Sequence, residues 1–118
     1  PLPIILFAPD SITVADASPH DRHIYDEALN IVVQVLQEKP DYQLKIIGYA
    51  NSTTDQPEEN EAELIPLSQK RAETIMSELE KRGVPKERMQ SEGKGRGAFP
   101  RIEGWKNRRV EFLLIPSH

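Results

Sequence analysis

The 118-residue sequence contains no cysteine. Disulfide bonds, zinc sites built on thiolates and thiol catalysis are therefore excluded. The sequence also lacks a run of roughly 18 apolar residues, which a membrane-spanning helix needs. The stretch Pro1–Ala8 is apolar, but it is short and has no basic start, so it predicts a β-strand and not a signal peptide.

Basic residues are in the minority, with 15 Lys and Arg against 19 Asp and Glu and a formal net charge of −4. Nucleic-acid-binding domains need a basic surface, so this balance argues against a nucleic-acid partner. The length suits one domain with a single core, spanning residues 1–118. Because the chain starts at Pro1 without Met, we expect it to be a fragment of a longer protein.

The first half of the chain predicts a strand, a helix and a second strand. We expect a buried strand over Ile4–Ala8 and a helix that begins near His20 and is stopped by Pro40. Gln43–Gly48 alternates in polarity, which predicts the second strand. The predicted helix has apolar residues at helical spacing on one face, namely Ile24, Ala28, Ile31, Val32, Val35 and Leu36.

Residues 49–66 are polar and acidic, and we predict a long loop there. Long loops in compact domains are usually functional or mobile. The spacing of the acidic residues lacks the pattern of a calcium-binding loop, so we expect them to be solvated. The carboxylates concerned are those of Asp55, Glu58, Glu59, Glu61 and Glu63.

The second half predicts a helix followed by two strands. Ser68 is a good N-cap, and Gly83 is suited to the C-terminal end of this helix. We expect a short strand over Met89–Glu92, a flexible turn over Gly93–Gly97 and a final, central strand over Val110–Leu114. Together the elements predict an α/β sandwich with helices packed on one face of a mixed sheet.

Four short motifs stand out along the chain: Leu44-x-Ile46-x-Gly48, Leu67–Ala72, Leu79–Val84 with Arg88, and Gly93-Lys94-Gly95 with Asn107–Glu111. In this order and spacing they resemble the OmpA-like domain. This domain is the cell-wall-anchoring module of outer-membrane proteins, peptidoglycan-associated lipoproteins and flagellar-motor stators. The resemblance implies a β-α-β-α-β(-β) sandwich, no catalysis, no cofactor, and a periplasmic protein attached to the outer membrane through a region absent from this chain.

The resemblance also implies a ligand, the diaminopimelate of the peptidoglycan stem peptide. In this family an Asp after the second strand suits the ligand's ammonium, and the Arg of LSxxRA grips its carboxylate through two parallel hydrogen bonds. Arg71 occupies the arginine position. Tyr49 is expected to shape the site. Arg108 is expected either to face the ligand or to support the fold, and for Arg109 we favour the supporting role.

The position of the family's Asp departs from the pattern. In the register that we favour, the Asp becomes the neutral Asn51, and Asp55 is the alternative. Hydrogen bonds to a charged group contribute roughly 1.5–3 kcal/mol against about 1 kcal/mol for neutral ones. Three hypotheses follow: weakened peptidoglycan binding, a scaffold that binds envelope proteins instead, or recognition of a stem with another diamino acid.

Two further features have simpler alternatives. Trp105, the one tryptophan, either stacks on a sugar or a partner, or covers one end of the core. His20 and His23 have a spacing that a metal site permits, but no third ligand is evident, so we predict no metal.

Overall fold

A computed structural model describes residues 2–7, 19–52, 57–98 and 104–116. Its four strands form one mixed sheet in the order β1-β4-β2-β3. Strand β4 runs antiparallel to β1 and β2, whereas β2 and β3 are parallel. The strands are β1 (Ile5–Leu6), β2 (Tyr42–Ala50), β3 (Met89–Arg96) and β4 (Arg109–Pro116).

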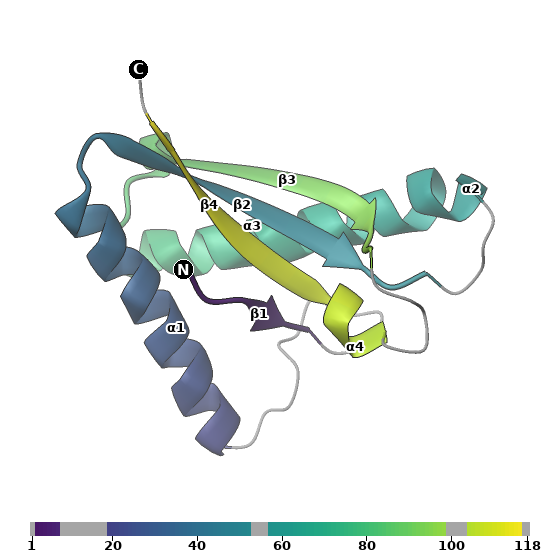
Figure 1. Ribbon diagram of the computed structural model, residues 1–118, viewed down its shortest axis with the longest axis horizontal. Coiled ribbons are helices and arrows are strands. Elements are labelled where there is room, and N and C mark those ends of the chain that lie inside the picture. Colours follow the sequence, from purple (N-terminus) through teal and green to yellow (C-terminus); the bar gives the residue numbers. More distant parts are fainter. Residues whose placement is uncertain (1, 8–18, 53–56, 99–103, 117–118) are drawn as a thin grey trace.

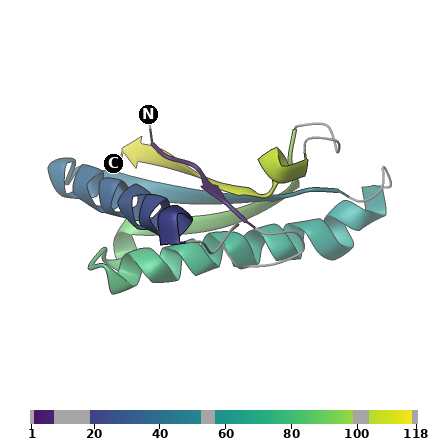
Figure 2. The same ribbon diagram turned by 90° about the horizontal axis from the view of Figure 1, so that it is seen from below.

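The two long helices lie on the same side of the sheet (Figures 1 and 2). The predicted sandwich of helices on one face of a mixed sheet is therefore confirmed. The predicted central position of the last strand is confirmed as well, because β4 lies between β1 and β2. The helices are α1 (Pro19–Glu38), α2 (Pro57–Glu59), the π-helical η1 (Asn60–Leu64), α3 (Ile65–Lys81), the 3₁₀ turn η2 (Lys86–Arg88) and α4 (Gly104–Asn107).

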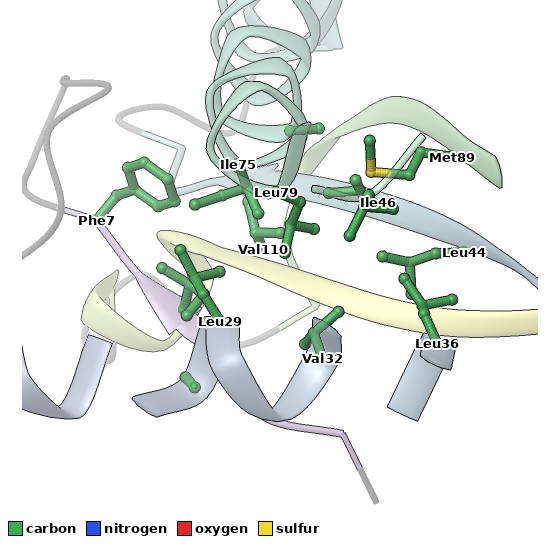
Figure 3. Close-up of a cluster of buried hydrophobic side chains, with 14 residues drawn as sticks. Phe7, Leu29, Val32, Leu36, Leu44, Ile46, Ile75, Leu79, Met89 and Val110 are labelled. Carbon is green, nitrogen blue, oxygen red and sulfur yellow. The ribbon is translucent and has the colours of Figure 1, made fainter. Parts of the chain in front are cut away.

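One hydrophobic core joins α1, α3 and the inner face of the sheet (Figure 3). Leu44 and Ile46 alternate along β2 with residues of the outer face, so both point toward the helices. Burial of each large apolar side chain contributes roughly 1.5–3 kcal/mol. The helices supply Ala28, Leu29, Val32 and Leu36 from α1 and Ala72, Ile75 and Leu79 from α3.

The predicted core face of α1 is partly wrong. Ile24 and Ile31 are 50% and 47% exposed, whereas Leu29, which the prediction omitted, is fully buried. The helix carries two overlapping apolar stripes, and the sheet contacts the one that contains Leu29. Periodicity alone does not distinguish two such stripes.

The predicted loop over residues 49–66 is wrong at both ends, because β2 includes Tyr49 and Ala50 and the chain is helical from Pro57 onward. There α2, η1 and α3 follow one another as helix (Figure 1). The wide π turn, closed by the Ile65 N–H bonding the Asn60 carbonyl, directly precedes Pro66. A proline ring clashes with the carbonyl four residues back in a regular α-helix, so the wider turn makes room for it. The polar residues from Pro57 to Leu64 therefore lengthen the helix at its N-terminal end.

The prediction that Ser68 caps the helix is consequently wrong, because Ser68 lies inside α3. Its hydroxyl donates to the Ile65 carbonyl at 2.9 Å and accepts a hydrogen bond from the Gly95 N–H at 2.9 Å. The second of these bonds satisfies a backbone donor of β3. Ser68 thus joins α3 to the sheet.

The predicted flexible turn over Gly93–Gly97 is also wrong, because β3 continues to Arg96. A Cβ on Gly93 would lie 2.3 Å from the Gln69 nitrogen, and one on Gly48 would lie 1.9 Å from the Ser68 carbonyl oxygen. The backbone of α3 therefore packs directly on β2 and β3. Glycines that read as a turn in the sequence are here required by close packing.

Candidate functional site

Arg71 is the largest fully buried side chain of the described residues. Helix α3 directs it toward the end of β2, where Nη1 donates to the Tyr49 carbonyl at 2.9 Å. Its Cζ lies 5.5 Å from the centroid of the Phe7 ring, a distance typical of a cation–π contact. A buried cation needs such partners to offset the loss of hydration. Arg71 is thus fixed between β2 and the residue that follows β1.

Asn51 lies directly after β2, two residues beyond the carbonyl that Arg71 binds. Its Oδ1 accepts a hydrogen bond at 3.0 Å from Nδ2 of Asn107, whose side chain is buried. The structure therefore brings the two favoured ligand residues, Asn51 and Arg71, to the same end of the same strand. Asp55, the alternative to Asn51, lies outside the described residues.

The backbone and the side chain of Tyr49 contact two different arginines. Its carbonyl binds Arg71, whereas its ring stacks on the guanidinium of Arg109, with Cζ 3.9 Å from the ring centroid. Burial, followed by the charge of Glu111, raises the pKa of Tyr49. The phenol is therefore neutral at pH 7.

Arg108 and Arg109 both contact the chain itself. Nε of Arg108 donates to the Phe7 carbonyl at 3.0 Å, and the Phe7 N–H donates to the Arg108 carbonyl at 2.7 Å. Arg109 donates from Nε to the Glu111 carboxylate and from Nη1 to the Lys106 carbonyl, the latter at 3.1 Å. These bonds support the fold, as expected for Arg109.

Phe7 and Asn107 were not among the predicted site residues. Asn107 carried a signal, because it is the first residue of the NRRVE motif. Phe7 carried none, since a lone aromatic residue in an apolar strand reads as ordinary core.

Trp105 is 53% exposed, and Nζ of Lys106 lies 5.4 Å from its ring centroid. The exposure contradicts the alternative in which Trp105 covers one end of the core.

The acidic residues of the predicted loop are not all solvated. Glu59 is buried, with Oε1 3.9 Å from Nη2 of Arg96. Within the described part of the chain, no three acidic or histidine side chains come together as metal ligands. His23 instead pairs with Glu27 at 3.0 Å on the surface of α1.

Comparison with known proteins decides the family. Residues 6–110 match the OmpA family. The chain belongs to the OmpA family. Its domain is accordingly a non-catalytic module.

One relative and two solved structures illustrate the range of this OmpA-like fold. The probable lipoprotein YiaD of Escherichia coli is 32% identical over 96% of this chain, which spans about half of that relative, or 52% of its length. The peptidoglycan-associated lipoprotein of Burkholderia pseudomallei is 25% identical, with a TM-score of 0.73 over 95% of this chain and 89% of its own. The periplasmic domain of Helicobacter pylori MotB is 16% identical, with a TM-score of 0.70 over 97% of this chain and 71% of its own. MotB thus shares the fold at low identity.

None of the helices in the described segments combines the length and the apolar character that crossing a membrane requires.

Proposed function

We propose that this OmpA-like domain binds the stem peptide of peptidoglycan and so tethers a protein of the bacterial envelope to the cell wall. The observation that carries the proposal is that Arg71, from the LSxxRA motif, binds the Tyr49 carbonyl at the end of β2, two residues before Asn51. Family membership supports it, as does the similarity to a peptidoglycan-associated lipoprotein. The protein would be periplasmic, with this chain as a single domain of it.

In this proposal Arg71 takes the carboxylate of diaminopimelate, or of another diamino acid, and Asn51 or Asp55 takes the ammonium. The Tyr49 carbonyl and the Phe7 ring hold the guanidinium in place before the ligand arrives. Such preorganisation reduces the entropy lost on binding. Arg71 has no exposed surface, so the stem peptide must first displace whatever covers the guanidinium.

Attachment to the outer membrane would come from a region outside this chain. The E. coli relative, of which this chain matches about half (52%), is named a probable lipoprotein. A lipid-anchored protein with a wall-binding domain would bridge the membrane and the wall.

A second candidate is an OmpA-like scaffold that binds envelope proteins and no longer binds peptidoglycan. The observation that favours it is that both predicted ligand groups make contacts within the chain. Arg71 is buried on Tyr49 and Phe7, and the Oδ1 of Asn51 accepts from Asn107. Asn51 also lacks the charge that an ammonium prefers.

Cosedimentation with purified sacculi distinguishes the two candidates. We expect the wild type to sediment with sacculi and Arg71→Lys to lose most of this binding, because an ammonium keeps the charge but not the forked donors. Arg88→Lys is the matched control, since Arg88 also binds backbone carbonyls but lies at the other end of β2. A wild type that stays in solution, together with an Asn51→Asp variant that does not sediment either, would favour the scaffold.

A further inference from the structure

We infer that the triplet Asn107-Arg108-Arg109, which leads from the end of α4 into β4, is a positioning element for Arg71 and does not itself touch the ligand. The inference rests on the proposed function, which it deepens by naming what sets the geometry of the binding residue. Arg71 is held from two sides, by the Phe7 ring and by the Tyr49 carbonyl. Residues of the triplet contact both Phe7 and Tyr49.

On the first side, Arg108 fixes Phe7. The strand β1 that precedes Phe7 has only two residues, Ile5–Leu6, and therefore holds its own end weakly. Arg108 closes a ring of two hydrogen bonds around the Phe7 backbone, one from the Phe7 N–H and one to its carbonyl. Both polar groups of the Phe7 backbone thus depend on one residue. A shift of Arg108 moves the aromatic ring against the Arg71 guanidinium.

On the second side, Arg109 and Asn107 fix the end of β2. The Arg109 guanidinium stacks on the Tyr49 ring, and it is itself tied to the Lys106 carbonyl of α4 and to the Glu111 carboxylate. Asn107 donates to Asn51 at 3.0 Å. The end of β2 is therefore bound to the triplet at two points. One is Tyr49, whose carbonyl binds Arg71, and the other is Asn51.

Contacts within the chain explain the position of each triplet residue without a bound ligand. Asn107 and Arg109 are buried, and the Nε of Arg108 is directed at a backbone carbonyl inside the fold. Binding sites need their contact groups held to within about 0.5 Å by supporting residues. The triplet is that supporting layer, because it joins β1, β2 and α4 around one guanidinium.

The experiment compares Arg108→Lys with Arg88→Lys, and it reads two signals. The first is the Nε–H resonance of Arg71 in a ¹⁵N–¹H spectrum, assigned by its disappearance in Arg71→Lys. The second is the affinity for sacculi. Arg88 donates to the carbonyls of Leu36, Lys39 and Tyr42, so its replacement disturbs the fold by the same chemistry far from Arg71.

We expect Arg108→Lys to shift or broaden the Arg71 resonance and to weaken binding about tenfold, the equivalent of about 1.4 kcal/mol. Arg88→Lys, at equal or greater loss of thermal stability, should change neither signal. Phe7→Leu, which keeps an apolar side chain but removes the ring, should reproduce the change in the Arg71 resonance. Its agreement with Arg108→Lys would show that the effect passes through Phe7.

An unchanged Arg71 resonance in Arg108→Lys would overturn the inference, whatever happens to binding. Weaker binding with that resonance unmoved would instead make Arg108 a direct ligand contact. If the wild type does not bind sacculi, the proposed function fails separately. The resonance comparison between Arg108→Lys and Arg88→Lys then still decides whether the triplet positions Arg71.

Discussion

The two ends of β2 are each held by an arginine, in different ways. At the Tyr42 end, Arg88 donates three hydrogen bonds to the backbone carbonyls of Leu36, Lys39 and Tyr42. These residues lie between the last turns of α1 and the start of β2. At the Ala50 end, Arg71 contacts the Tyr49 carbonyl and the Phe7 ring, which come from different strands of the sheet. At the first end, Arg88 makes these bonds by itself. At the second end, the partners of Arg71 are in turn held by Arg108 and Arg109.

This difference separates an arginine that completes a turn from one that occupies a site. Arg88 joins three backbone carbonyls between the end of α1 and the start of β2, so its role is explained by the fold. Arg71, on α3, contacts Tyr49 of β2 and Phe7, which follows β1. Arg108 binds the Phe7 carbonyl, and Arg109 of β4 stacks on the Tyr49 ring. A fold that needs only a hydrogen bond to one strand end does not require such an arrangement. This difference is why the proposed binding site is the Ala50 end.

The largest expected effect comes from breaking the Ala50 end with Gly48→Ala. The new Cβ would meet the Ser68 carbonyl oxygen at 1.9 Å and the Ala72 nitrogen at 3.3 Å, and α3 would have to move away from the sheet. We expect a loss of about 3 kcal/mol in the free energy of unfolding, measured by urea denaturation. Gly83→Ala is the control, because Gly83 has φ +100° but no atom within 4 Å of its Cβ. That variant should lose about 1–2 kcal/mol, and an equal loss in both would contradict the close packing at Gly48.

The next effect comes from breaking the Tyr42 end with Arg88→Met. The variant keeps an apolar stem but removes the donors to the three carbonyls. We expect a loss of about 2–3 kcal/mol in stability, measured by urea denaturation. Binding to sacculi per folded molecule should stay at the wild-type level. A specific loss of binding in this variant would remove the distinction between the two ends.

Asn51→Asp sharpens the Ala50 end without disturbing its packing. The carboxylate still accepts from Asn107 and adds the charge that suits an ammonium. Affinity for a diaminopimelate-containing stem peptide should rise about tenfold, measured by calorimetric titration. The gain should shrink as salt is added. An unchanged affinity would transfer the ammonium contact to Asp55.

The smallest effect lies between the two ends, at the surface pair of Lys45 and Glu92. The hydrogen bond from Lys45, 2.6 Å away, lowers the pKa of Glu92. Because the folded-state pKa is depressed, the pair stabilises the fold above the unfolded-state pKa, and this contribution is lost as the pH falls through the folded-state value. Lys45→Met should return the Glu92 midpoint toward its ordinary value in an NMR titration. A midpoint that does not move would contradict the assigned cause.

Local patterns were sufficient to predict the frame of the fold. The alternation over Gln43–Gly48 located β2, and Pro40 correctly followed the end of α1. The errors arose where a distant segment decides the structure. The sequence around Ser68 is typical of a helix cap, but in the structure its hydroxyl accepts a hydrogen bond from β3. The sequence around Gly93 is typical of a turn, but in the structure α3 packs directly on this residue.

The candidate site could be proposed from the sequence only through its motifs. LSxxRA located Arg71, and the strand pattern that ends at Gly48 fixed the register in which Asn51 follows β2. The burial of Arg71 and the role of Phe7 depend on contacts between residues far apart in the sequence. A pattern of neighbouring residues contains no record of these contacts.

The most direct test of the account is a chemical-shift map of the isotope-labelled wild type titrated with a diaminopimelate-containing stem peptide. We predict that the largest changes fall on Tyr49–Asn51 and on the side-chain signal of Arg71. The signals of Arg88 and of the Tyr42 end of β2 should stay in place. Changes centred on any other surface, or no changes at millimolar ligand, would contradict the assignment of the Ala50 end as the peptidoglycan site.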